Sequence, residues 1–353
     1  MVIAVYADLK YDSSPDNLYF LKSFIENFAI TYPEHKFHLI VPDNFIDGFD
    51  ETLVQVKSLH SKSPFSRQFF LERKALKTIK DIKAERLFSF NSVFKTKISQ
   101  VVLFDDVKTN KKFGVKALQK MASIFVLSES EKVLLVNQYR LDPQKIEIIY
   151  GGHSKLVGSI TDETKETTKE KYTKGNEYFF YRGVIEKNQN IISLLKAFSI
   201  FKKRQKSSMK LVLMGKVVRQ KTEFDKLIGS YKYREDVVIV VNTSPLDEAQ
   251  IVAAAYAYVQ PHSNNILLFL FDALRSGVPV LLDKIPANEI FSDAALYFEK
   301  ANDADMADKM MMVYKDESLR SQLIERGKKI NDIYTWEKSI SIVGQNLQLS
   351  RTD

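Results

Sequence analysis

The sequence predicts an α/β protein made of two Rossmann-like domains that face each other across a cleft. Short apolar runs alternate with amphipathic stretches along most of the 353 residues, which is typical of parallel sheets with helical crossovers. The chain is too long for one ordinary hydrophobic core. We expect an N-terminal domain at residues 1–153, a C-terminal domain at residues 154–335, and a last helix at about 336–350 that packs back on the N-terminal domain.

The first half predicts repeated β-α-β units. Its expected strands are apolar runs of strand length at residues 2–6, 36–41, 86–90, 100–104, 123–127 and 146–149. Its expected helices are residues 17–31, 66–83 and 111–121, and a further one is opened by Ser128-Glu-Ser-Glu131. In that segment Ser precedes Glu by three residues, the spacing of a capping box.

The second half repeats the pattern after residues 161–176, a Thr, Lys and Glu stretch that we interpret as a surface excursion. The expected strands are residues 178–181, 210–214, 237–241, 258–260, 280–282 and 295–298. The expected helices are residues 189–204, 221–230, 247–257, 303–315 and 317–334. Because open parallel sheets bind ligands at the carboxyl ends of their strands, the predicted cleft is the expected site.

Composition excludes several classes of function. The sequence has no cysteine, which excludes disulfides, thiolate metal sites and a cysteine nucleophile. The net charge of +8 suits phosphorylated substrates or an anionic membrane, but it also fits a plain lysine-rich surface. Because no nucleic-acid-binding motif accompanies the lysines, we expect no nucleic-acid partner. A reducing, cytoplasmic location is expected, and no transmembrane run or signal peptide is predicted.

The segment that starts near residue 261 carries the strongest functional signal. Pro261 opens a polar loop, and an apolar helical stretch with a single acid, Asp272, follows it. The start of a helix offers unpaired N–H groups and a positive dipole end to phosphate. A carboxylate behind it can accept hydrogen bonds from ribose hydroxyls. The segment therefore predicts a sugar-nucleotide site.

The C-terminal half resembles the GT-B-fold retaining glycosyltransferases of family 4, also described as glycosyl transferases group 1. The resemblance covers roughly residues 100–345 and is weaker before them. The stretches that carry it are YFFYRGVIEKNQNIISLLKAF at 178–198, LVLMG at 211–215, the segment at 254–279, and AALYF at 294–298 with YTWE at 334–337. It implies an acceptor-binding N-terminal domain and a C-terminal domain that binds the donor nucleotide.

Three donor-binding side chains follow from the resemblance. Arg182 and Lys187 match the family residues that grip the donor diphosphate, where negative charge grows on the leaving group. Asp272 matches the second of two glutamates and would hold the ribose. Structural alternatives stay open for all three: a rim partner of Glu186 for Arg182, a solvated helix start for Lys187, and a cap or ion pair for Asp272.

The residues expected nearest the transferred sugar depart from the family pattern. Asn264 replaces the first glutamate, and an amide can bind a hydroxyl but cannot stabilise a cationic sugar as a carboxylate can; a helix N-cap is the alternative. Asp105 matches a polar position beside the reacting sugar, with loop capping as its alternative. The expected catalytic residues are thus Asn264 and Asp105. The main-chain N–H groups expected at the donor are those of Asn265, Ile266, Leu267 and Leu268.

The resemblance implies transfer of a sugar from a nucleoside-diphosphate sugar to a hydroxyl acceptor, either a saccharide or a lipid-linked glycan, with retention. The donor is a substrate, and no cofactor or bound metal is expected. The basic residues Arg73, Lys74, Lys77 and Lys80 either meet an anionic membrane face or form a solvated helix face. The departures from the family motif favour one alternative, an inactive glycosyltransferase-like partner subunit or sugar-nucleotide binder. A GT-B sugar-nucleotide epimerase is disfavoured, because the sequence lacks a clear set of acid/base residues for that reaction.

Overall fold

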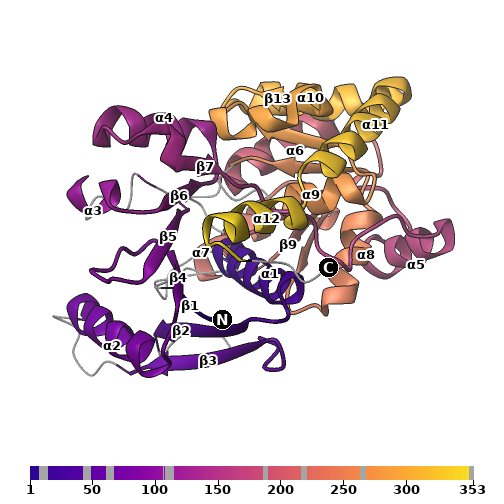
Figure 1. Cartoon of the computed structure of the whole chain (residues 1–353). Coiled ribbons are helices and arrows are strands. Elements are labelled where there is room, and N and C mark those ends of the chain that lie inside the picture. Colours follow the sequence, from indigo (N-terminus) through magenta and orange to yellow (C-terminus); the bar gives the residue numbers. More distant parts are fainter. Residues whose placement is uncertain are drawn as a thin grey trace. The chain divides into compact units, whose positions relative to one another are not determined.

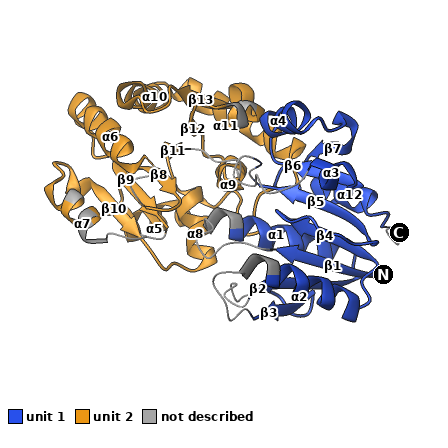
Figure 2. Ribbon diagram, turned by 90° about the vertical axis from the view of Figure 1, so that its left-hand side faces the viewer, with its two compact units in different colours: residues 1–151, 336–353 blue, residues 152–335 orange. Residues whose placement is uncertain are grey.

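The computed structural model describes residues 1–7, 15–42, 49–60, 67–105, 107, 115–185, 190–215, 221–262 and 268–349. The chain divides into two compact units, coloured separately in Figure 2: unit 1 is residues 1–151 with 336–353, and unit 2 is residues 152–335. Each unit is a parallel sheet covered by helices (Figure 1), so the predicted fold class of two Rossmann-like domains is confirmed.

Unit 1 contains, in its described part, a seven-stranded parallel sheet of order β3-β2-β1-β4-β5-β6-β7. Its strands are β1 (Val2–Ala7), β2 (Lys36–Pro42), β3 (Val54–Leu59), β4 (Arg86–Phe90), β5 (Ser99–Phe104), β6 (Ser123–Val126) and β7 (Ile146–Ile148). Its helices are α1 (Pro15–Thr31), α2 (Arg67–Asp81), α3 (Val115–Gln119), α4 (Glu129–Tyr139), the 3-10 turn η1 (Pro143–Lys145) and α12 (Trp336–Asn346).

Both faces of this sheet are apolar, because helices cover each of them. One face packs its side chains against α2, and farther along the sheet against α3 and α4. On the other face, Phe88 and Phe90 meet Phe24 of α1 at ring distances of 4.9 and 5.7 Å. The sequence prediction missed β3, an edge strand whose central residues are exposed. An edge strand lacks the apolar run by which a buried strand is found.

Helix α12 belongs to unit 1 although it follows unit 2 in sequence. The ring of Trp336 lies 5.5 Å from that of Phe20, and Figure 1 shows α12 along α1. A β-carbon added at Gly344 would lie 2.0 Å from the hydroxyl of Tyr32, a side chain that is 2% exposed. Only glycine at 344 therefore allows the two helices to approach this closely.

Unit 2 contains, among its described residues, a six-stranded parallel sheet of order β10-β9-β8-β11-β12-β13. Its strands are β8 (Tyr178–Arg182), β9 (Lys210–Met214), β10 (Val237–Val240), β11 (Ala257–Gln260), β12 (Val280–Asp283) and β13 (Ala295–Phe298). Its helices are α5 (Asp162–Thr173), α6 (Ile191–Gln205), α7 (Lys221–Ser230), α8 (Pro245–Ala253), α9 (Leu268–Arg275), α10 (Asp303–Lys315) and α11 (Glu317–Ile333), with 3-10 turns η3 (Arg234–Asp236) and η4 (Pro286–Ala294).

The register of the sheet sorts its side chains between two helical layers. Phe179, Tyr181 and Leu281 pack with α6 and α10 in one core. Residues that alternate with them face the other way, where the Tyr178 hydroxyl donates to the Ile251 carbonyl of α8 at 2.5 Å. Arg182 follows Phe180 by two residues, so it shares the face of α8 and α9.

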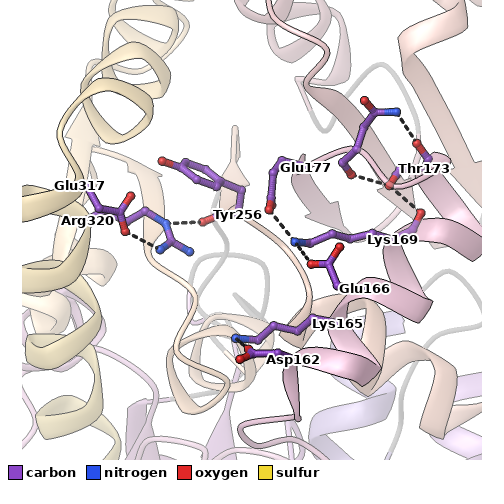
Figure 3. Close-up of polar contacts among 10 residues, drawn as sticks. Asp162, Lys165, Glu166, Lys169, Thr173, Glu177, Tyr256, Glu317 and Arg320 are labelled. Carbon is purple, nitrogen blue, oxygen red and sulfur yellow. Dashed lines mark hydrogen bonds and ion pairs between the residues drawn. The ribbon is translucent and has the colours of Figure 1, made fainter.

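Within the polar stretch at residues 161–176, interpreted from the sequence as a surface excursion, Asp162–Thr173 form helix α5. Thr161 caps α5 by accepting a hydrogen bond from the Thr164 N–H at 3.2 Å. Lys169 is buried and reaches Glu177 at 2.5 Å and Glu166 at 3.0 Å, as Figure 3 shows. Ion pairs and a cap hold a helix that its few apolar residues do not predict.

Candidate functional site

The main chains that leave β8 and β9 approach each other closely at the carboxyl edge of the unit 2 sheet. The Gly183 N–H donates to the Met214 carbonyl at 3.0 Å. Gly215 has φ of 142°, and a β-carbon there would lie 1.9 Å from the Gly183 carbonyl oxygen. Glycine is therefore required at 215, and this position adds no side chain next to the end of β8, where Arg182 lies.

Arg182 is the last residue of β8, and its guanidinium contacts Glu248, Asp272 and Phe269. Its Nη2 donates to Oε2 of Glu248 at 2.6 Å, and its Nη1 lies 3.7 Å from Oδ2 of Asp272. Its guanidinium carbon lies 3.9 Å from the centre of the Phe269 ring. The side chain is only 13% exposed. Charged partners and an aromatic face together fix the position and the plane of a guanidinium.

Asp272 is a fully buried acid on α9. Its Oδ1 accepts a hydrogen bond from the Ser154 N–H at 2.7 Å. Its Oδ2 is buried without a hydrogen-bond donor in the described part of the chain, and its charged neighbour is Arg182. Burial raises the pKa of Asp272 to about 6, although Arg182 and the Ser154 N–H oppose that shift. The carboxyl therefore keeps one oxygen able to accept a hydrogen bond.

Glu248 lies in the first turn of α8, and each of its oxygens has its own donor. Oε2 accepts from Arg182, and Oε1 accepts from the Thr243 hydroxyl at 3.2 Å. The Ser244 side chain caps α8 by accepting from the Asp247 N–H at 3.1 Å. The positive end of the α8 dipole also favours a carboxylate at this place. Glu248 is thus a fixed acid beside Arg182.

Residues at and just after the end of β11 are hydrogen-bonded to their neighbours as far as His262, the last described residue before α9. The Tyr258 hydroxyl lies 3.0 Å from the Arg182 carbonyl and 3.0 Å from Oε1 of Gln260. The Gln260 amide donates to the His262 carbonyl at 2.7 Å, and Asn190 donates to the Pro261 carbonyl at 3.1 Å. These bonds place the start of the polar loop beside the end of β8.

Of the predicted donor-binding side chains, the structure brings Arg182 and Asp272 together. Leu268 is the first residue of α9, and its side chain is buried. Five predicted residues lie outside the described part of the chain: Lys187, Asn264, Asn265, Ile266 and Leu267.

Asp105, the predicted catalytic acid, directly follows β5 in unit 1. Its main-chain N–H donates to Oδ1 of Asn91 at 3.1 Å, and its residue is half-buried. Of the predicted capping box, the N-cap is confirmed, because Ser128 accepts from the Glu131 N–H at 3.4 Å at the start of α4. The Glu131 carboxylate accepts instead from the main-chain N–H groups of Val107 and Leu127. Asp105 therefore sits at the carboxyl edge of its own sheet.

Sequence reasoning missed the groups that contact Arg182 and Asp272. Glu248, Phe269 and Ser154 lie 66, 87 and 28 residues from Arg182 along the chain, and each reaches the site from a different element. The one local signal was the Ser-Pro-Leu-Asp-Glu start of α8, which places an acid at the carboxyl end of β10. Only the tertiary structure shows that this acid, Glu248, pairs with Arg182.

Two other kinds of feature are absent from the described residues. No group of three or more His, Cys, Asp and Glu side chains could hold a metal ion there. Likewise, no described helix is both long and apolar enough to cross a membrane.

Residues 162–330 match the family model described as Glycosyl transferases group 1. The match includes Arg182, Glu248 and Asp272 and spans most of unit 2. No protein of curated function matches the chain in sequence.

Several solved structures share the fold of the whole chain. WaaG, a glycosyltransferase involved in lipopolysaccharide biosynthesis, is 15% identical with a TM-score of 0.77, over 97% of this chain and 99% of that one. A glycosyltransferase from Rickettsia africae is 15% identical with a TM-score of 0.78, over 99% of each chain. HepE from Anabaena, solved with UDP and glucose, is 11% identical with a TM-score of 0.76, over 99% of this chain and all of that one. The chain therefore has the two-domain GT-B fold of these glycosyltransferases, and its second unit matches the Glycosyl transferases group 1 model.

Proposed function

We propose that the chain is a glycosyltransferase that moves a sugar from a nucleoside-diphosphate sugar to a hydroxyl of a saccharide or lipid-linked glycan. The observation that carries the proposal is the pair of Arg182 and the buried Asp272 at the carboxyl edge of the unit 2 sheet. It lies inside the segment that matches the glycosyltransferase family model. HepE, a protein of the same fold, was solved with UDP-glucose.

The donor side of the reaction follows from the charges at this edge. Negative charge grows on the diphosphate as the bond to the sugar breaks, so a cation beside it accelerates the reaction. Arg182 and Lys187 supply that charge in our proposal, which is why no bound metal is needed. Oδ2 of Asp272 accepts a hydrogen bond from a ribose hydroxyl. We assign the main-chain N–H groups of residues 265–268 to the donor phosphates, as the sequence of this segment predicts.

Asn264 and Asp105 are our proposed catalytic residues, each assigned a hydrogen bond to the transferred sugar because the resemblance implies it. We propose retention of the configuration at the transferred carbon, as the resemblance to family 4 implies. Proton NMR of the first-formed product distinguishes the two anomers directly. An inverted product would contradict this part of the proposal.

A second function has specific support. Asn264 stands where the family carries an acid, and Arg182 already pairs with two carboxylates. A sugar-nucleotide binder or inactive partner subunit would keep the nucleotide site and lose turnover. Such a protein would bind the donor without ever releasing its diphosphate.

One experiment separates the two functions. The protein is incubated with a panel of UDP-, GDP-, ADP-, CDP- and dTDP-sugars, and both its melting temperature and the release of free nucleoside diphosphate are measured. A donor at 100 times its Kd stabilises by about 2.7 kcal/mol. A melting shift with slow release supports the transferase, and a shift without release supports the binder. No shift with any donor, or an equal shift after Arg182→Ala with Lys187→Ala, would refute the site.

We also propose that the protein works at the cytoplasmic face of an anionic membrane. Leu71, Ala75 and Ile79 pack α2 onto the sheet, and its opposite side carries a stripe of exposed residues. The stripe consists of Phe70, Arg73, Lys77 and Lys80. Cations beside an exposed aromatic ring suit a bilayer surface.

Co-sedimentation with phosphatidylglycerol vesicles tests this contact. Arg73→Glu with Lys77→Glu should weaken binding by about tenfold or more, since each cation near an anionic surface contributes about 1 kcal/mol. Lys165→Glu on α5 is the control. Equal binding by all three proteins would show that α2 is a solvated face.

A further inference from the structure

The Arg182 guanidinium contacts Glu248 of α8 and two residues of α9, Asp272 and Phe269, and Glu248 has no role in the reaction described above. Asp272 belongs to the donor site, and Phe269 supplies the ring on which the guanidinium lies, 3.9 Å from its centre. The third group is Glu248, whose bond of 2.6 Å to Nη2 is the shortest of these contacts. A strong, charge-assisted bond at this distance decides where the guanidinium rests.

The topology of unit 2 explains why these groups meet. Strand β11 is the neighbour of β8 in the sheet. Helix α8 leads into β11, and α9 leads out of it. Both helices lie on the face toward which Arg182 points, so Glu248 and Asp272 approach the guanidinium from the two connections of one strand.

Glu248 is itself fixed before it binds the arginine. Its Oε1 accepts from Thr243, so only Oε2 is used on Arg182. The start of helix α8 is fixed by its cap, because the Ser244 hydroxyl oxygen accepts from the main-chain N–H of residue 247 at 3.1 Å. The Thr243 hydroxyl and helix α8 both fix the Glu248 carboxylate, so we expect it to stay bound to Arg182. A carboxylate that released Arg182 when a ligand bound would not need the additional hydrogen bond from Thr243.

We propose that Glu248 is a positioning residue for the donor diphosphate, which acts by holding Arg182 in its binding orientation over Phe269. The inference rests on the proposed donor site. An arginine that is already held loses less conformational freedom when it binds phosphate, so affinity is gained without a new contact to the ligand. A competing acid would do the opposite, because its removal would release Arg182 and tighten binding.

UDP, GDP, ADP, CDP and dTDP are first compared by the melting shift that each produces. The affinity of the nucleoside diphosphate with the largest shift is then measured by isothermal titration calorimetry. Glu248→Ala should raise its Kd by about tenfold, the loss expected for one charge-assisted hydrogen bond. Glu248→Gln keeps an oxygen acceptor for the guanidinium and should stay within about threefold of wild type. A structural role alone would not produce this rescue.

Asp247→Ala is the matched control, because it removes the neighbouring acid from the same helical turn without touching Arg182. It should leave the Kd unchanged. Glu248→Ala should also have no further effect in an Arg182→Ala background, because the two residues act as one unit. The melting temperatures of the unliganded variants show whether each is folded. If Glu248→Ala does not fold, Glu248→Gln and Phe269→Leu carry the comparison, and Phe269→Leu should weaken binding severalfold.

The possible results separate this inference from the proposed function. If wild type binds no diphosphate on the panel, both fail. If wild type binds and Arg182→Ala does not, the donor site stands. An unchanged or lower Kd for Glu248→Ala then refutes the positioning role alone. An equal loss in Asp247→Ala refutes it as well, because the effect would belong to the charge of the helix start.

Discussion

Glu131 in unit 1 and Asp272 in unit 2 are both buried acids near the carboxyl edge of a parallel sheet, but their oxygens are used differently. Main-chain N–H groups bind both oxygens of Glu131, Val107 at 3.0 Å and Leu127 at 3.4 Å. In Asp272, one oxygen accepts from Ser154, and the other has no hydrogen-bond donor among the described residues. A carboxylate whose two oxygens both accept main-chain hydrogen bonds has a structural role. A carboxylate with one oxygen that lacks a donor can accept a hydrogen bond from a ligand.

The largest expected difference between the two acids is in pH dependence. Burial raises the pKa of Asp272 from its ordinary 3.8 to about 6, so the folded protein binds this proton more tightly than the unfolded chain does. The resulting stability is fully present below pH 3.8 and is lost as the pH rises to about 6. Relative to Asp272→Asn, the wild-type free energy of unfolding should fall by up to about 3 kcal/mol across this window.

Urea unfolding of both proteins at pH 3.5 and pH 7 checks the prediction, with hydrogen exchange of unit 2 peptides as the probe. The difference between wild type and variant should change with pH in the stated direction. A difference that is the same at both values would mean that Asp272 titrates at its ordinary pKa.

The next largest effect is on donor affinity. Asp272→Ala removes the proposed ribose acceptor and should weaken binding of the donor diphosphate by about 30-fold, the value of one hydrogen bond to a charged group. Glu131→Gln should leave the affinity unchanged, because its oxygens already serve the main chain. Calorimetric titration measures the Kd of the diphosphate for both variants. A similar loss of affinity in both would contradict the proposed difference between the two acids.

Glu131→Gln should instead destabilise unit 1 by about 1–3 kcal/mol, because an amide has one acceptor oxygen and leaves a buried N–H unpaired. The single tryptophan, Trp336, lies in unit 1, so its fluorescence reports on that unit. Glu129→Gln is the control, since this exposed acid lies in the same turn. Equal stability of the two variants would show that the hydrogen bonds of Glu131 to the Val107 and Leu127 N–H groups do not stabilise unit 1.

The smallest expected effect concerns Thr243. Thr243→Val removes the hydroxyl that donates to Oε1 of Glu248 and should raise the Kd of the diphosphate by about two- to fivefold. The effect is smaller than that of Glu248→Ala because the hydroxyl acts on the diphosphate only through Glu248 and Arg182. Thr243→Ser keeps the hydroxyl and should bind like wild type. Weaker binding by the serine variant would place the effect in packing rather than in the hydrogen bond.

Much of the fold could be predicted because its strands are buried on both faces. Residues such as Ile3, Ala4 and Val5 are fully buried, and a run of this kind is visible in the sequence. The exceptions have a physical cause. Strand β3 is an edge strand with four exposed residues, and α5 is stabilised by a cap and by ion pairs rather than by an apolar stripe.

The site was predicted in part. Arg182 and Asp272 could be named because each lies in a local stretch that resembles a family segment. Glu248 and Phe269 could not be named, because their importance comes from contact with Arg182. No periodicity or composition records which arginine a given acid will meet.

The sequence by itself determined the alternation of strands and helices, the glycine at 215 and the acid at 272, because each depends on local preference or burial along a short segment. Tertiary structure decided what those residues do together. The order β10-β9-β8-β11-β12 sets β8 beside β11, and it brings the helices on either side of β11 to one face. That arrangement places a basic side chain between two acids from distant parts of the chain, because a charge buried there must find its partners in space and not in sequence.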